Sequence, residues 1–331
     1  MSEKRGIIGA GNWIVDRIMQ IDRWPGEGNL CNILSTENAT GGGPANVLFD
    51  LAAMTPDIPL YAAGCVGDDA DGVYLRAEAE KRSINVDYLL RKAGKNSSFT
   101  EVMSGEGKRT FFHCRGANAE FSPEDLENIS FPAKIFYLGY LLLLDKLDEA
   151  DTKYGTQASK LLAMMQKKGY YTAVDLVSEA PDKFNRIVIP ALRYIDALII
   201  NEVEAGNAFG LAVRRSDDTL DMDLLRQAAE KFLENGVRDR VVVHYPEGAF
   251  ALTASGECET VKSFKVEHIV GSNGAGDAFC AGVIYAMHEN LPLKETLLYG
   301  AASAHFNLGC ASASGGAVAV EKLDALVATA R

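Results

Sequence analysis

Short apolar runs alternate with longer stretches of helical periodicity along most of this 331-residue chain. Runs rich in β-branched and aromatic residues predict strands at 135–138, 171–176, 197–200 and 240–244. Apolar positions at helical spacing predict helices over 148–168, 183–192 and 222–235. This β-α-β-α order predicts an α/β fold, in which helices cover both faces of a mostly parallel sheet.

Two regions, 12–40 and 96–115, break this order because they contain strand patterns but hardly any helical periodicity. In the second region, strand patterns at 99–103 and 109–113 flank a turn at 104–107, which is typical of a hairpin. We expect these two regions to form a small β lid inserted in a single domain that spans residues 1–331.

The chain carries 33 basic and 45 acidic residues, a net charge of −12. Such a field repels phosphate backbones and anionic lipids, so it argues against nucleic acid and membrane surfaces as partners. The longest uncharged apolar stretch, 135–144, is about half of the ~20 residues that span a bilayer.

Neither the six cysteines, which lack a Cys-x-x-Cys pair, nor the five histidines show metal-binding spacing. The sequence therefore argues against a zinc enzyme. Because the N-terminal residues also lack a secretory pattern, we expect reduced thiols and a cytoplasmic protein.

The most informative segment is a glycine-rich turn at 271–276 that leads into an apolar helix. Successive amides of Gly274, Ala275 and Gly276 at a helix start can form an anion cradle. Asp277 follows in the first helical turn, where it could accept a proton from a hydroxyl while the cradle stabilises a transferring phosphoryl group. An ordinary capped helix start explains this segment equally well.

Three successive glycines precede a second helical pattern that begins near residue 44. Gly42 and Gly43 would let the backbone approach a ligand closely, and Asn46 offers both a donor and an acceptor. A flexible loop before a helix is the alternative interpretation.

A third loop follows the first predicted strand, and its Asn12 and Asp16 could either bind polyol hydroxyls or cap a turn. Gly9-x-Gly11 begins like a dinucleotide-binding fingerprint, but Ile14 replaces its third glycine. A dinucleotide oxidoreductase is therefore a weakly supported alternative.

Together these motifs resemble those of the ribokinase-like carbohydrate kinases, also called the PfkB family, over essentially the whole chain. The matching segments are 42–46, 115–125, 201–204 and 274–277. The resemblance implies a three-layer α/β/α sandwich with a small β lid. It also implies transfer of the γ-phosphoryl group of ATP to an alcohol of a sugar or nucleoside.

The same resemblance implies specific roles. Asp277 would be the catalytic base, and the amides of Gly274, Ala275 and Gly276 the anion hole. The acceptor-binding residues would be Asn12, Asp16, Gly42, Gly43 and Asn46. The nucleotide-binding residues would be Asn201, Glu204, Gly248, Ala304 and Asn307. Glu204 would also hold Mg²⁺ through water, so ATP and Mg²⁺ are the expected cofactors. The lid often makes a homodimer contact in such kinases.

The chain departs from the family pattern in the glycine-rich turn and in the nucleotide loop. Gly271 and Ser272 stand where the family commonly has Asp-Thr, which puts activation by a monovalent cation in doubt. The loop that begins at His244 is one residue shorter than the common pattern. These departures leave a catalytically weak ligand-binding relative as an alternative.

The predicted hairpin carries Lys108, Arg109, His113 and Arg115. If they faced the pocket, they could clamp a phosphate or carboxylate on the acceptor. We favour a solvated hairpin and hence a neutral sugar as acceptor, with a nucleoside kinase of the same fold as the alternative.

Overall fold

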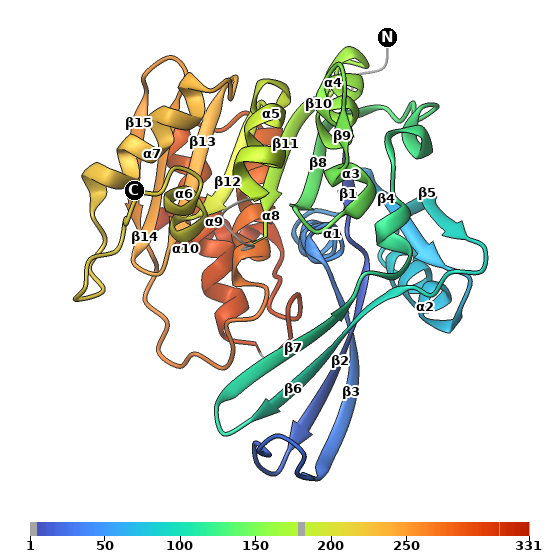
Figure 1. Ribbon diagram of the computed structural model, residues 1–331. Helices are drawn as coiled ribbons and strands as arrows, with labels where there is room; N and C mark the ends of the chain where they lie inside the picture. Colours follow the sequence, from blue (N-terminus) through green and yellow to red (C-terminus); the bar gives the residue numbers. More distant parts are fainter. Residues whose placement is uncertain (1–4, 178–182, 311, 331) are drawn as a thin grey trace.

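The computed structural model describes residues 5–177, 183–310 and 312–330. Its main element is a nine-stranded sheet in the order β15-β14-β13-β12-β11-β8-β1-β4-β5 (Figure 1). The strands are β1 (Gly6–Gly11), β4 (Leu60–Gly67), β5 (Asn85–Lys92), β8 (Ala133–Leu141), β11 (Tyr171–Leu176), β12 (Ala197–Asn201), β13 (Arg240–Tyr245), β14 (Gly248–Thr253) and β15 (Cys258–Lys262). The strands from β5 to β13 are parallel, and only β14 and β15 pair antiparallel. The predicted mostly parallel sheet is confirmed.

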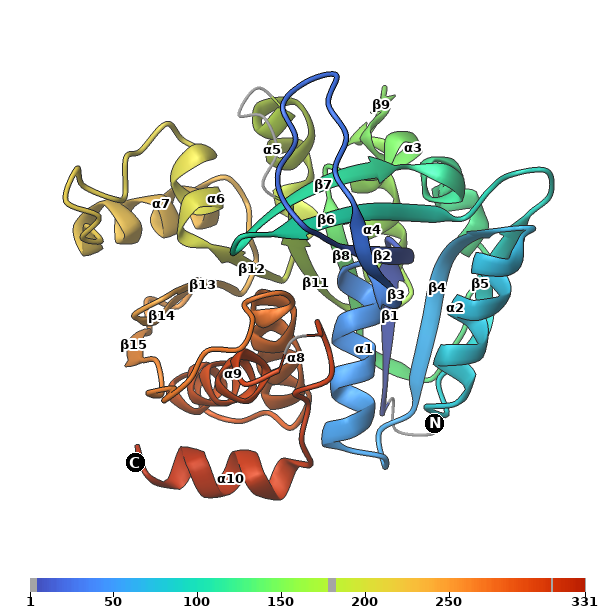
Figure 2. The same ribbon diagram turned by 90° about the horizontal axis from the view of Figure 1, so that it is seen from below.

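Helices cover both faces of this sheet, as Figure 2 shows. The helices that pack on one face are α1 (Gly43–Met54), α2 (Ala70–Glu80), α8 (Ala275–His288), α9 (Leu293–Leu308) and α10 (Val320–Ala328). Those on the other face include α4 (Gln157–Lys167), α6 (Glu202–Asn207) and α7 (Met222–Glu234). Successive side chains of a strand point to opposite faces, so Ile7 joins one apolar cluster and Ile8 the other. The result is the predicted three-layer sandwich.

A second sheet projects from the main body (Figure 1) and has the strand order β3-β2-β6-β7. Its strands are β2 (Ile14–Ile21), β3 (Ile33–Gly41), β6 (Ser98–Gly105) and β7 (Lys108–Cys114). β2 pairs antiparallel with β3 and parallel with β6, and β6 and β7 form the predicted hairpin. The two strand-rich regions of the sequence therefore join in one sheet.

The helix predicted over 148–168 is wrong in its first half, because α4 begins only at Gln157. The short α3 (Asp145–Asp148) ends there, and β9 (Ala150–Asp151) and β10 (Gly155–Thr156) pair antiparallel. The Asp151 carboxylate accepts two backbone N–H groups in the turn, and Gly155 has a φ of +92°. Thr156 then caps α4 by accepting the N–H of Ser159. Because residues 148–156 carry few apolar side chains, this turn and cap chemistry decides where the helix begins.

The helix predicted over 183–192 is irregular. It consists of a π-helical turn, η3 (Phe184–Val188), then α5 (Ile189–Ala191) and a 3₁₀ turn, η4 (Leu192–Tyr194). Pro190 cannot donate a backbone hydrogen bond, which favours this break in the α-helical pattern. Within the described residues, no helix is both long and apolar enough to cross a membrane.

Candidate active site

Asp277 lies in the first turn of α8, and its side chain is buried. Its Oδ2 accepts hydrogen bonds from Nδ2 of Asn46 at 2.8 Å and from the phenol of Tyr140 at 2.9 Å. Burial raises the pKa of Asp277 to about 6, and the two hydrogen bonds oppose that rise. A carboxylate with this pKa is largely ionised at neutral pH and can accept a proton from a hydroxyl.

Two buried amide oxygens lie on the same side of the site, on Asn12 and Asn46. Neither has a hydrogen-bond partner in the part of the chain that the structure describes. The Asn12 side chain is held by its Nδ2, which donates to the carbonyl of Tyr140 at 3.2 Å. Because an unpaired buried acceptor is costly, these oxygens are suited to accept hydrogen bonds from ligand hydroxyls.

The glycines at 41–43 allow the chain to pass close to these groups. Gly42 has a φ of +93°, and a Cβ there would lie 2.1 Å from the carbonyl of Asn12. A Cβ at Gly41 would lie 2.4 Å from Oδ2 of Asp16. Both positions therefore exclude other residues, and the backbone at 41–42 lies against two of the predicted acceptor-binding residues.

Asp16 reaches this region from β2 of the second sheet. Burial raises its pKa to about 6, a hydrogen bond with Thr100 lowers it, and the charge of Asp277 raises it further. Asp16, Thr100 and His113 are aligned across three strands. Oγ1 of Thr100 also lies 3.0 Å from Nδ1 of His113, so the three side chains form a hydrogen-bonded row.

Two more buried acids complete the cluster, Asp50 of α1 and Asp175 of β11. Asp175 accepts the phenol of Tyr137 at 2.7 Å and the N–H of Tyr140 at 2.6 Å. Neither oxygen of Asp50 has a partner among the described residues. Burial, reinforced by the charge of Asp277, raises the pKa of both acids well above the ordinary aspartate value.

The start of α8 has the geometry of an anion-binding turn. Gly274 adopts a φ of +74°, and a Cβ there would lie 2.2 Å from the carbonyl of Ala313, so only glycine fits. The amide of Ala275 makes a long 3.4 Å contact with the carbonyl of Ser272. The amides of Gly274 and Gly276 have no acceptor in the described chain, which leaves them available to an anion.

Two cavities meet beside this turn. One, of about 260 Å³, is lined by Asp277, Tyr140, Asp175 and Glu204 among others. The other, of about 510 Å³, is more apolar and includes Phe279, Ala301, Ala304, Leu308 and Gly248 in its lining. Asn201, His244 and Gly276 line both cavities, so they mark the passage between them.

Neither lining contains a lysine or arginine among the described residues. The ring of His244 lies 5.0 Å from that of Phe279 and is tilted against it by 36°. Burial lowers the pKa of His244 to about 4, so it is neutral at pH 7. Binding of an anion in these cavities would therefore depend on backbone amides, on neutral hydrogen-bond donors and on any cation bound to the anion.

Asn201 and Glu204 form a capping box at the start of α6. The side chain of Asn201 accepts the N–H of Glu204 at 2.8 Å, and Oε2 of Glu204 accepts the N–H of Asn201 at 3.1 Å. Glu204 is buried but lines the smaller cavity. Its carboxylate is the hard oxygen donor that Mg²⁺ prefers, and the cap holds it in place.

Asn307 is the one predicted nucleotide-binding residue that the structure does not bring to either cavity lining. It is buried, and its Nδ2 donates to the carbonyl of Ala313 at 2.6 Å. Asn307 therefore supports the segment that packs against Gly274.

The basic residues of the hairpin do not line the cavity around Asp277. Lys108 and Arg109 line a third cavity of about 590 Å³, between the hairpin and residues 269–273, which shares Ile269 and Ser272 with the larger of the two cavities above. Arg115 forms an ion pair with Asp145 at 3.3 Å.

The sequence patterns missed Tyr140, Asp50 and His244. Tyr140 lies near the carboxyl end of β8, and His244 near that of β13, where parallel strands of an open α/β sheet place ligand-binding groups. That rule could have indicated both residues. Asp50 gives no such signal, because an aspartate on a helical pattern is ordinarily exposed.

Comparisons with known proteins agree with this geometry. The model of the pfkB family carbohydrate kinases matches residues 10–319. An adenosine kinase from Schizophyllum commune is 25% identical over 78% of this chain and 75% of its own length. A ribokinase from Schizosaccharomyces pombe is 24% identical over 89% of each chain. The structure of an Arabidopsis thaliana ribokinase with ribose and ATP superposes with a TM-score of 0.78 at 21% identity, covering 98% of each chain.

The chain belongs to the pfkB family of carbohydrate kinases. It is therefore a phosphotransferase with an alcohol group as acceptor, and the oxidoreductase alternative is wrong. The structure explains the misleading glycine: Gly11 has a φ of +124°, and a Cβ there would lie 2.4 Å from the carbonyl of Gly139. That glycine is required for close packing of two strands.

Proposed function

We propose that this kinase transfers the γ-phosphoryl group of ATP to a hydroxyl of a small neutral sugar, with Asp277 as the catalytic base. The observation that carries the proposal is the position of Asp277. Its buried carboxylate lies in the first turn of α8, beside free backbone amides, lines a cavity and accepts a hydrogen bond from Asn46.

The acceptor would lie against Asp16, Asn12 and Asn46. The unpaired oxygens of the two asparagines would accept hydrogen bonds from its hydroxyls. One hydroxyl would give its proton to Asp277 as its oxygen forms a bond to the γ-phosphorus, while the bond from that phosphorus to the β–γ bridging oxygen breaks. ADP would leave with the bridging oxygen. The amide of Gly276 would stabilise the charge on the transferred group.

The nucleotide base would occupy the larger, more apolar cavity, against Gly248 and Ala304. The triphosphate would then pass His244 and Gly276, which line both cavities. Glu204 and Asn201 fit a hydrated Mg²⁺, which when bound would neutralise phosphate charge. Such neutralisation matters here because the described linings contain no lysine or arginine.

A neutral acceptor is supported by the position of the basic hairpin residues. Lys108 and Arg109 line a different cavity, and Arg115 pairs with Asp145. The intact base and anion-binding turn argue against a weak ligand-binding relative. A nucleoside kinase is the second candidate, because an adenosine kinase is among the relatives at 25% identity.

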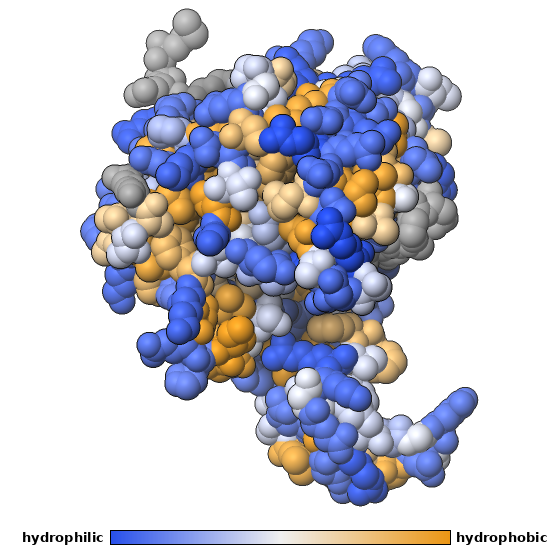
Figure 3. Space-filling model, turned by 90° about the vertical axis from the view of Figure 1, so that its left-hand side faces the viewer, coloured by the Kyte–Doolittle hydropathy of each residue, from blue (hydrophilic) through white to orange (hydrophobic). Residues whose placement is uncertain are grey.

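The second sheet would serve as a lid and as a homodimer contact. Its strands and loop expose large apolar side chains, namely Leu30, Ile33, Leu34, Phe111 and Phe112. Figure 3 shows apolar atoms among the polar ones on this projecting part. Light scattering coupled to size-exclusion chromatography should give a dimer mass, and Leu34→Asp with Phe112→Asp should lower it to that of a monomer.

An ATP-consumption screen tests the acceptor class. It would compare neutral sugars, sugar phosphates, sugar acids and nucleosides, each with and without K⁺. We expect turnover with neutral sugars and little change with K⁺. A clear preference for sugar phosphates or sugar acids would contradict the neutral acceptor, and one for nucleosides would favour the second candidate.

A further inference from the structure

Tyr140 forms hydrogen bonds with three residues of the site, although the proposed phosphoryl transfer assigns it no role. Its phenol donates to Oδ2 of Asp277, its N–H donates to Asp175, and its carbonyl accepts from Asn12. One residue therefore connects the base, a second buried acid and the acceptor side.

The backbone and the neighbouring helix are adapted to this side chain. Tyr140 has a φ of +60°, which is uncommon for a residue other than glycine. A Cβ at Gly43 would lie 2.9 Å from Cδ1 and 3.0 Å from Cε1 of the Tyr140 ring. The absence of a side chain at Gly43 thus lets the ring reach Asp277 across the start of α1.

The charges around Asp277 show why a donor is needed. Asp16 of β2, Asp50 of α1 and Asp175 of β11 interact electrostatically with it, and each in its ionised form would repel its negative charge. The groups that oppose this repulsion are two neutral donors, Asn46 and Tyr140. Burial and the charges of Asp277 and Asp175 raise the pKa of Tyr140 well above the ordinary tyrosine value, so its phenol remains a donor at neutral pH.

We propose that Tyr140 is a positioning residue for the catalytic base. Its phenol, with the amide of Asn46, occupies Oδ2 of Asp277, keeps that carboxylate ionised and leaves Oδ1 to accept the proton of the attacking hydroxyl. This inference rests on the base role proposed above for Asp277.

The test is Tyr140→Phe, which keeps the ring beside Gly43 and removes only the hydroxyl. The acid limb of the kcat profile should move up by about one pH unit, so activity on that limb should fall about tenfold while activity near pH 8 changes much less. The carboxyl ¹³C titration of Asp277 in the protein without substrate should shift in the same direction, which provides a readout independent of turnover.

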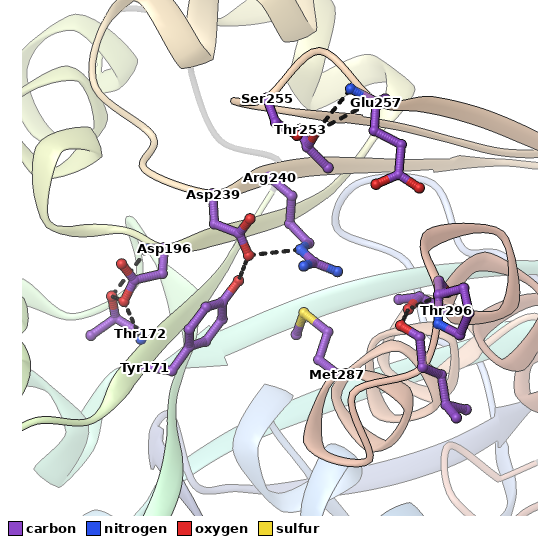
Figure 4. Close-up of polar contacts among 12 residues, drawn as sticks. Tyr171, Thr172, Asp196, Asp239, Arg240, Thr253, Ser255, Glu257, Met287 and Thr296 are labelled. Carbon is purple, nitrogen blue, oxygen red and sulfur yellow. Dashed lines mark hydrogen bonds and ion pairs between the residues drawn. The ribbon is translucent and has the colours of Figure 1, made fainter.

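Tyr171→Phe is the matched control, because it removes a partly buried phenol that donates to Asp239 at the amino ends of the strands, opposite the site (Figure 4). Its acid limb should stay at the wild-type pH. If Tyr140→Phe unfolds, Tyr140→Leu provides the same measurement, since it also removes the hydroxyl.

An unchanged acid limb and an unchanged Asp277 titration in folded Tyr140→Phe would overturn the inference. Asp277→Asn separates this failure from failure of the proposed function. If that variant keeps turnover, the base assignment is wrong. If it loses turnover while Tyr140→Phe shows no shift, only the role of Tyr140 is wrong.

Discussion

Aspartates at the amino ends of the parallel strands have different partners from those at the carboxyl ends. At the amino ends, Asp239 accepts from Tyr171 and pairs with Arg240, as Figure 4 shows. Asp196 accepts the N–H and hydroxyl of Thr172 at 2.8 and 2.9 Å. These carboxylates have a cation or several donors, which is the arrangement that stabilises a fold.

At the carboxyl ends, the buried Asp50, Asp175 and Asp277 and the half-buried Asp16 lie close enough to interact, and the described cavity linings contain no lysine or arginine. Among the described residues, only phenols and amides donate to Asp277 and Asp175, and Asp50 has no partner. The difference shows that buried acids without a cationic partner, rather than burial of acids as such, distinguish the edge where the proposed base lies.

The largest expected effect comes from Asp277→Asn and Asp239→Asn measured side by side. Asp277→Asn should lower kcat by about 10³-fold while ATP binding persists, because it removes the base and preserves shape. Asp239→Asn should leave kcat within about twofold but lower the free energy of unfolding by about 1–2 kcal/mol. Steady-state kinetics, ATP titration and denaturant unfolding provide the comparison. Equal losses of kcat in the two variants would contradict the distinction between the edges.

The pH dependence of stability comes next. The pKa of Asp16 and of Asp277 is about 6 in the folded protein against an ordinary 3.8. Their protonated forms therefore stabilise the fold fully below pH 3.8, and this contribution is lost as the pH rises to about 6. Asp277→Asn should gain stability relative to wild type over that interval, by up to about 3 kcal/mol. Urea midpoints between pH 4 and 7 would show it, and parallel curves would contradict it.

Asp16→Asn should raise KM for the acceptor by about 30-fold and leave KM for ATP nearly unchanged. The reason is that the carboxylate faces the acceptor side, and hydrogen bonds to charged groups contribute about 1.5–3 kcal/mol. Initial rates with each substrate varied in turn measure both constants. If the KM values for the acceptor and for ATP rose similarly, Asp16 would support the structure of the whole site and not bind the acceptor.

Asp50→Leu should raise the free energy of unfolding at pH 7 by about 1–2 kcal/mol, because it replaces a buried unpaired acid with an apolar side chain. Asp50→Asn is the size-matched control and should change stability less. A clear loss of stability in the leucine variant would show that Asp50 makes a hydrogen bond as a neutral acid.

The smallest effect is expected at the hairpin. Lys108→Ala combined with Arg109→Ala should change KM for a neutral acceptor by less than about threefold, since these cations line another cavity. A tenfold rise would mean that they reach the acceptor, and would contradict the solvated hairpin.

Much of the fold could be predicted from periodicity, because parallel strands and amphipathic helices have distinct apolar patterns. The failure at 148–156 has a local cause: this segment carries few apolar residues, and the Asp151 turn and the Thr156 cap delay the start of the helix. The glycine-rich motifs were predictable for a related reason. Gly42 and Gly274 have positive φ angles, which residues other than glycine disfavour. A glycine at such a position in the sequence therefore indicates the local backbone conformation.

The sequence by itself determined the fold class and singled out the glycine-rich turn and Asp277 as candidates, because these depend on local patterns and on residue types with narrow conformational uses. Only the tertiary structure decided which groups act on that aspartate. Asn46 is 231 residues away and Tyr140 is 137 residues away, and they meet Asp277 because α1, β8 and α8 converge at one sheet edge. Burial at that edge, which no local pattern encodes, is what raises its pKa to about 6.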